Sequence, residues 1–124
     1  MMRAALGVLG LLAALLLSVP GVAAAAEVLQ VRSGNLLQVG DHNRTYSVEL
    51  ACLNLPADGD AAAAAWLREQ LPRRTRVNLR PLSNHEGALL ARVQRLGSGG
   101  VDGIDLSQGL INAGLATPLP ECQA

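Results

Sequence analysis

Hydrophobic and polar residues alternate along four stretches of the chain, residues 28–39, 45–53, 76–82 and 88–96. Alternation with a period of two is typical of β-strands that bury one face. The first stretch is interrupted at Ser33–Asn35 by residue types that favour turns, so it predicts two strands joined by a turn. Together the four stretches predict five strands.

Two further stretches favour helices. Residues 61–71 begin with five alanines and end before a proline, and Asp60 stands where a helix N-cap is expected. Residues 106–113 are the second predicted helix, with Asp105 as N-cap and Gly114 as a left-handed C-terminal residue. One helix should therefore follow the third strand, and the other should follow the fifth.

The order of three strands, a helix, two strands and a helix predicts a mainly β fold with helices. A small curled sheet would form a partly open, five-stranded barrel on which two or more helices pack. In the third strand, Tyr46 and Val48 fall on one face, and Ser47 and Glu49 fall on the other. We expect the first face to be buried. Tyr46 and Trp66 are the only aromatic residues, and both are predicted to belong to the core.

The first 26 residues have the pattern of a secretory signal peptide. Arg3 precedes an apolar run from Ala4 to Val19, and small residues follow up to Ala26. We expect cleavage after Ala26, which leaves residues 27–124 as one small domain. A retained N-terminal membrane anchor is the alternative, although the uninterrupted apolar run is shorter than the ~20 residues of a spanning helix.

Positive and negative charges balance. The chain has ten basic residues, all arginine, and ten acidic residues, so any binding to nucleic acid or anionic membranes needs a local patch. Six arginines near the last two strands form a candidate anion-binding stripe: Arg73, Arg74, Arg76, Arg80, Arg92 and Arg95. The stripe either binds phosphate, nucleic acid or lipid headgroups, or is a solvated face paired with acids. The scarcity of aromatic residues for base stacking favours the second interpretation.

Both cysteines, Cys52 and Cys122, follow the predicted leader. An even number of cysteines in an exported chain is typical of a disulfide, and the chain-entropy model assigns so long a loop ~4 kcal/mol. Two unpaired thiols, with Cys52 a small core residue, are the alternative. Two thiols and two distant histidines do not form a ligand cluster, so we expect neither a metal site nor a cofactor.

The order of the elements and four motifs resemble the staphylococcal-nuclease-like (thermonuclease) family. The matching segments are 48–50 (its Val-Arg-Leu strand), 52–56 (its Gly-Ile-Asp-Ala-Pro turn), 87–93 (its Gly-Arg-x-Leu-Ala-x-Val strand) and 110–116 (its Leu-Val-x-x-Gly-Leu-Ala helix). The resemblance covers residues 28–118 and implies an OB-type barrel, which in that family cleaves nucleic acid phosphodiesters with a calcium ion. It also implies a C-terminal tail that returns to the turn at Cys52.

The family's chemical residues are replaced in this chain. Its calcium ligands correspond to Ser33, Asn35 and Asn54, its catalytic arginines to Glu49 and Ala88, and its general-base glutamate to Ala57. Phosphodiester hydrolysis needs positive charge beside the oxygens that become negative in the transition state, and a calcium ion prefers carboxylate ligands. The resemblance therefore implies a barrel without the family's base, ion site or arginine clamp.

The remaining acidic residues in loops are predicted to be structural. Asp58 and Asp60 should form a polar turn that caps a helix, with ion binding by both as the alternative. Asp102 and Asp105 should likewise be turn and cap residues.

Two histidines and two glutamates are further candidates for chemistry. His42 and His85 each lie in a turn without a partner nearby in the sequence, so we expect exposed loop histidines. The resemblance places Glu49 and Glu86 on the walls of the family's pocket. We expect both to be solvated, with an acid–base pair as the alternative.

The sequence thus predicts an exported nuclease-like barrel without catalytic activity, which acts as a binding or structural module on a protein partner. Its compartment would be the periplasm or the extracellular space, or the thylakoid lumen if the source is photosynthetic, with no membrane contact after cleavage. Two alternatives stay open. One is a calcium-dependent or altered phosphodiesterase that uses Asp58, Asp60, Glu49 or Glu86. The other is a barrel that binds anions or nucleic acid through the arginine stripe.

Overall fold

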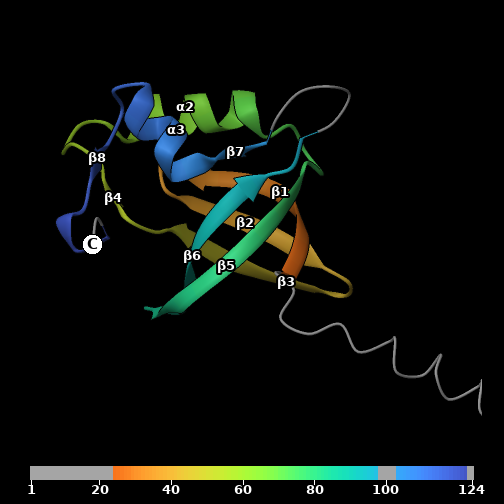
Figure 1. Ribbon diagram of the computed structural model, residues 1–124. Coiled ribbons are helices and arrows are strands. Elements are labelled where there is room, and N and C mark those ends of the chain that lie inside the picture. Colours follow the sequence, from red (N-terminus) through yellow and green to blue (C-terminus); the bar gives the residue numbers. More distant parts are fainter. Residues whose placement is uncertain (1–23, 98–102, 123–124) are drawn as a thin grey trace, which may run out of the picture.

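Five strands close into a barrel with two helices at one end in a computed structural model of the protein, which describes residues 24–97 and 103–122 (Figure 1). The barrel strands are β1 (Ala24–Ser33), β2 (Leu36–Asp41), β3 (Arg44–Leu50), β5 (Arg76–His85) and β6 (Ala88–Arg95). They are hydrogen-bonded in the order β3-β2-β1-β5-β6, and β3 also pairs with β6 in parallel, which closes the barrel. This confirms the predicted mainly β fold with a five-stranded OB-type barrel, although the barrel is closed where the sequence predicted a partly open one.

Both predicted helices are present and lie together over one end of the barrel (Figure 1). α2 spans Asp60–Gln70 and α3 spans Leu106–Asn112. Four short elements were not predicted: β4 (Leu53–Asn54), β7 (Ile104–Asp105), β8 (Thr117–Pro118) and the 3₁₀ helix η1 (Pro120–Cys122). Elements of two or three residues are too short to show a periodicity. Within the described residues, no helix combines the length and the hydrophobicity needed to span a membrane.

The core joins inward-facing strand residues to one side of each helix. Its most deeply buried members are Val28, Leu37, Val39, Val48, Leu50, Val77, Leu79 and Val93 from the barrel, and Leu67, Leu106 and Leu110 from the helices. Tyr46 and Trp66 pack half-buried against this core, as predicted. A Cβ atom on Gly109 of α3 would lie 2.5 Å from the Trp66 ring, so this glycine permits the close contact between the two helices.

The predicted helix ends are found in α3, whereas the predicted N-cap of α2 is not. In α3, a backbone N–H of the first turn donates to Asp105 Oδ1 at 3.0 Å, and Gly114 follows the helix with a φ of +78°, which confirms both predictions. For α2 the prediction is wrong, because Gly59 is the N-cap and no side chain caps the helix. Asp60 lies in the first turn instead, and its Oδ1 accepts a hydrogen bond from the Gly34 N–H at 2.7 Å. The backbone of the distant β1–β2 turn therefore binds the carboxylate that was predicted to cap α2.

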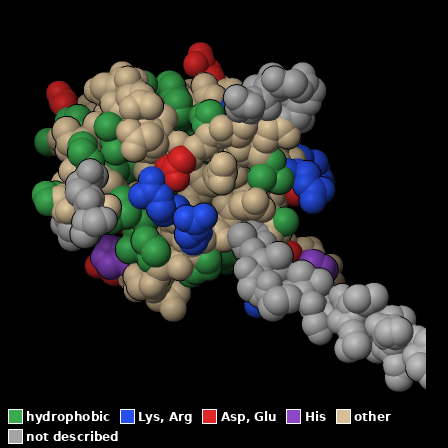
Figure 2. All heavy atoms as spheres, in the orientation of Figure 1, with side chains coloured by type: hydrophobic (Ala, Val, Ile, Leu, Met, Phe, Trp, Pro, Cys, Tyr) green, Lys and Arg blue, Asp and Glu red, His purple; other side chains and the backbone are tan. Residues whose placement is uncertain are grey.

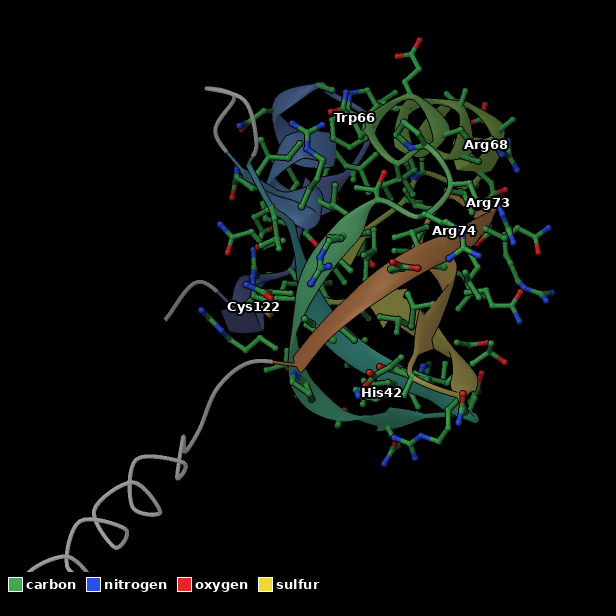
Figure 3. All side chains as sticks on the ribbon, turned by 90° about the vertical axis from the view of Figure 1, so that its right-hand side faces the viewer. His42, Trp66, Arg68, Arg73, Arg74 and Cys122 are labelled. Carbon is green, nitrogen blue, oxygen red and sulfur yellow. A yellow bond between two sulfur atoms is a disulfide. The ribbon has the colours of Figure 1, made fainter. Side chains whose placement is uncertain are left out.

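The C-terminal tail is fastened to the turn after β3. Cys52 and Cys122 form a disulfide with Cα atoms 5.7 Å apart, so the predicted bridge is confirmed and the alternative of two unpaired thiols is wrong. The Leu119 N–H donates to the Cys52 carbonyl at 3.3 Å, and β8 pairs with β4 beside this link. Figure 3 shows Cys122 on the opposite side of the view from Arg73 and Arg74.

β1 begins within the predicted leader. Residues 1–23 lie outside the described part of the chain, whereas Ala24–Ala26 pair with Val77–Leu79 of β5. Ala26 is 5% exposed. Cleavage after Ala26 would therefore remove three of the four residue pairs that join β1 to β5.

A chain that starts at Glu27 should be less stable than a chain that starts at Ala24. The truncation removes buried Ala26 and three ladder pairs, and losses of this kind cost about 1–3 kcal/mol in total. Each kcal/mol lowers the melting temperature of a domain of this size by about 4–8 °C. Thermal unfolding of the two purified chains measures the difference, and equal melting temperatures would contradict a stabilising role for Ala24–Ala26.

The variant Cys122→Ser should melt at a lower temperature than the parent protein under oxidising conditions. The bridge joins residues 70 positions apart, and the chain-entropy model assigns a loop of this length ~4 kcal/mol. With a reductant present, both proteins should melt at nearly the same temperature, because neither then has the bridge. If the variant still melts at a lower temperature than the parent in the reductant, the effect comes from the packing of the sulfur atom and not from the bridge.

Candidate functional site

The β1–β2 turn, where the sequence resemblance would place the family's ion-binding turn, lies against the end of β3. The Asn35 carbonyl accepts the Leu50 N–H at 2.8 Å, and Ser33 Oγ donates to the Asn35 side chain at 3.2 Å. A Cβ atom on Gly34 would lie 2.8 Å from the Leu55 side chain, so the loop before α2 approaches the turn closely. Ser33 and Asn35 thus hold the turn through hydrogen bonds with each other and with β3.

Asp60 brings a carboxylate to this turn from α2, but the Gly34 N–H already binds it. Asp58 and Asn54 are exposed on the neighbouring loop and on β4. Within residues 24–97 and 103–122, no group of three or more His, Cys, Asp and Glu side chains is arranged to hold a metal ion. Ion binding by Asp58 and Asp60 therefore gains no support from this geometry.

Glu49 lies on β3 between Leu36 of β2 and Leu90 of β6, and its side chain contacts His85 at the end of β5. His85 Nδ1 lies 2.8 Å from Glu49 Oε1. An ionised carboxylate can only accept, so the imidazole donates this hydrogen bond. The sequence offers His85 no partner nearby along the chain, and the partner that the structure shows is distant. The histidine is exposed, as expected, but it binds a residue 36 positions away in the sequence.

The hydrogen bond to Glu49 raises the pKa of His85 above its ordinary value of 6.5, and the charges of Glu49 and Glu86 add to the effect. His85 is therefore protonated over a wider pH range than a free histidine. The sequence resemblance assigns the position of Glu49 to a catalytic arginine. The structure gives Glu49 a histidine partner, where the alternative from the sequence was an acid–base pair with Glu86.

A hollow of about 250 Å³ lies beside this pair, and we call it the Glu49–His85 hollow. Its other lining residues are almost all apolar: Leu50, Ala51, Leu53, Leu82, Leu90, Leu119 and the disulfide-bonded Cys52 and Cys122. Leu82 is 52% exposed and is the only large hydrophobic residue exposed to this extent in the described ranges. The tail after α3 forms one wall, so the disulfide also shapes the hollow. Sequence reasoning missed it, because its lining comes from four separate segments.

Two arginines of the candidate stripe contact β1. Arg74 forms an ion pair with Glu27 at 2.9 Å, and Arg73 donates to the Leu29 carbonyl at 3.1 Å, so both lie beside β1 (Figure 3). Figure 2 shows basic side chains in separate groups, with an acidic side chain next to one of them. The arginines nevertheless lie close to one another: Arg74 and Arg76 line one hollow, Arg76 and Arg95 line a second, and Arg80 is opposite Arg92 in the pairing of β5 with β6.

The arginines of β6 are also engaged. Arg92 makes two hydrogen bonds of 3.0 Å to Asp105, and Arg95 donates to Gln70 Oε1 at 2.7 Å. Arg76 and Arg80 are exposed, and their side chains have no hydrogen bond or ion pair with other described residues. Four of the six arginines thus hold elements of the fold together, as the structural interpretation of the group expects.

The other candidate positions offer little chemistry. His42 is exposed in the β2–β3 turn, as predicted, with Nδ1 2.7 Å from Asp41 Oδ1. Ala57 is exposed and Ala88 is half-buried on β6. Asp102 lies outside the described residues.

Comparisons with known proteins do not identify a family. No protein-family model matches the chain, and a search of curated proteins finds no significant match. The resemblance to the staphylococcal-nuclease-like family rests on the order of the predicted elements and on four sequence motifs.

An NMR titration of the intact protein should give His85 a pKa above 6.5. Glu49→Gln should lower this pKa, because it removes the charged hydrogen-bond acceptor, whereas Glu69→Gln on the exposed side of α2 should not change it. A raised pKa in the folded state contributes stability below the unfolded pKa and loses it as the pH rises through the folded pKa. Glu49→Gln should therefore cost more stability at about pH 5.5 than at about pH 8.5. An unchanged pKa in Glu49→Gln would show that the pair does not persist in solution.

Proposed function

We propose that the protein is an exported, non-catalytic barrel module that acts by contact with a protein partner. The single observation that carries this proposal is the hydrogen bond between Glu49 and His85. It joins a carboxylate, at a position that the sequence resemblance assigns to a catalytic arginine, to an imidazole. The half-closed, mainly apolar hollow beside the pair supports a binding role.

The charge at this position opposes phosphodiester hydrolysis. The reaction builds negative charge on phosphate oxygens, which catalysts stabilise with arginine, lysine or metal ions. An ionised Glu49 repels those oxygens, and its bond to His85 offsets the positive charge of the imidazole. At the neighbouring turn, Ser33 and Asn35 offer hydroxyl and amide oxygens in place of the carboxylates that a calcium ion prefers.

Two features support export. Residues 1–26 have the pattern of a secretory leader. The Cys52–Cys122 disulfide is of a kind that persists in oxidising compartments such as the periplasm, the extracellular space or the thylakoid lumen. Because Ala24–Ala26 pair with β5, processing before Ala24 would leave the barrel complete.

Binding of anions or nucleic acid by the arginines has less support. Only Arg76 and Arg80 of the six lack a partner among the described residues, and the chain has few aromatic side chains for stacking. A titration with single-stranded DNA at two salt concentrations tests this alternative. An affinity that falls steeply with salt, and that Arg76→Gln or Arg80→Gln weakens, would favour it over a protein partner.

The protein should not cleave DNA or RNA in the presence of calcium, even at high protein concentration. The double variant Glu49→Arg/Ala88→Arg should also be inactive, because it restores two guanidinium groups but no carboxylate ligand for the ion. Cleavage of a fluorogenic oligonucleotide, with and without a chelator, measures both. A calcium-dependent turnover that Glu49→Gln or Asp58→Asn abolishes, and that Glu69→Gln preserves, would overturn the proposal and favour an altered phosphodiesterase.

A further inference from the structure

We propose that the Glu49–His85 hollow binds a short peptide segment of a partner protein, and that this segment presents an apolar side chain next to a basic one. The inference rests on the proposed function as a binding module. It adds the place of contact and the chemistry of the partner.

The apolar lining of the hollow favours the binding of an apolar side chain. Leu82 lies on β5 after Leu79, which is the last residue of β5 that pairs with β1. The pairing with β1 therefore does not reach Leu82, which is exposed. It is not an isolated surface leucine, because Leu53, Leu90 and Leu119 line the same hollow. A shared apolar surface of this kind gains free energy when a partner removes it from water.

The size of the hollow favours one side chain over a free small molecule. Its volume of about 250 Å³ is below the roughly 300–1,000 Å³ of pockets that enclose drug-sized ligands. Its wall is already fixed, because the disulfide and the Leu119 hydrogen bond hold the tail against the turn at Cys52. A wall fixed in advance reduces the ordering cost of binding.

The charges around the hollow favour a basic neighbour for that side chain. Glu49 and His85 are the only charged residues that line it, and no arginine does. The Glu49 side chain is 25% exposed, and one of its oxygens has no partner among the described residues. Glu86 adds negative charge on the side of His85. A guanidinium or ammonium group would satisfy the second Glu49 oxygen and complement this charge.

Other occupants fit less well. Glu49 and Glu86 repel the phosphates of a nucleic acid, and the lining has no aromatic side chain on which a base could stack. An acidic peptide would meet the same repulsion, and a peptide without an apolar side chain would leave the leucines in contact with water.

NMR titration of the ¹⁵N-labelled protein tests the inference with three blocked tripeptides: acetyl-Leu-Arg-Leu-amide, acetyl-Leu-Glu-Leu-amide and acetyl-Ser-Arg-Ser-amide. The first should give saturable amide shifts confined to residues 49–53, 82–90 and 119–122. The other two should bind about threefold to tenfold more weakly, because each loses one of the two complementary interactions.

Matched variants separate the two interactions. Glu49→Gln and Leu82→Ser should each weaken binding of the first peptide by about threefold to tenfold. Glu69→Gln on α2 and Leu29→Ser on β1 remove the same groups outside the hollow and should leave the affinity within about twofold. Thermal unfolding of every variant shows whether it is folded, and exposed Leu82 can be replaced without opening the core.

Equal binding of the three peptides, or amide shifts that map away from the hollow, would overturn the inference. Unchanged affinity of the first peptide in both hollow variants would also overturn it, as would the absence of amide shifts at about 10 mM of that peptide. The inference is also overturned if an oligothymidylate produces the same shifts. These failures leave the proposed function intact as long as the protein does not cleave nucleic acid. Calcium-dependent cleavage would overturn the proposed function whatever the peptides do.

Discussion

The parallel pairing of β3 with β6 is the contact on which the barrel and the candidate site both depend. It joins Val48–Leu50 to Leu89–Ala91, and the Ala51 N–H extends it with a 2.9 Å hydrogen bond to the Ala91 carbonyl. Without it, β3 and the part of β6 before its pairing with β7 would be open edges of a curved sheet whose buried face meets water. The same pairing brings Glu49 beside the β5–β6 hairpin that carries His85. Closure of the barrel and assembly of the site are therefore one event.

The end of β3 is also where the remaining parts of the molecule attach. The Ala51 carbonyl accepts a 2.7 Å hydrogen bond from Ser107 Oγ, so the one fully buried polar side chain of α3 is satisfied there. The next residue, Cys52, has a φ of +70°, a left-handed conformation that costs a residue other than glycine roughly 1–2 kcal/mol. The disulfide and the Leu119 hydrogen bond act on this residue and hold the tail against it. The left-handed turn, helix α3 and the C-terminal tail thus all involve the two consecutive residues Ala51 and Cys52.

Arginine serves this small fold mainly as a connector. A guanidinium group has several donors in a fixed plane, so it can join elements that share no backbone hydrogen bonds. Arg92 links β6 to Asp105, which also caps α3, and Arg95 links β6 to the last residue of α2. Among the described residues, four of the six arginines of the candidate stripe have their side chains engaged in contacts of this kind. This use leaves Glu49 and Glu86 to determine the charge around the hollow.

The sequence by itself determined the elements that repeat a local pattern. Alternation predicted the five barrel strands, composition predicted both helices, and Asp105 and Gly114 were identified as the ends of α3 because each acts within its own helix. Two cysteines allow only one intramolecular pair, so the bridge could be predicted from their number and from the resemblance. A period of two or 3.6 residues reports which face a side chain belongs to, and local propensity reports where a helix ends.

Only the tertiary structure determined which distant residues the side chains of these elements contact. Asp60 has the sequence signature of a cap, yet the Gly34 N–H, 26 positions away, holds its carboxylate. His85 is 36 positions from Glu49 in the sequence and nevertheless binds it, because the register of β3 against β6 and the length of the β5–β6 hairpin bring them together. Local pattern carries no information about that register. The pairing depends on how the whole barrel closes around its core, and a single chain segment cannot specify this closure.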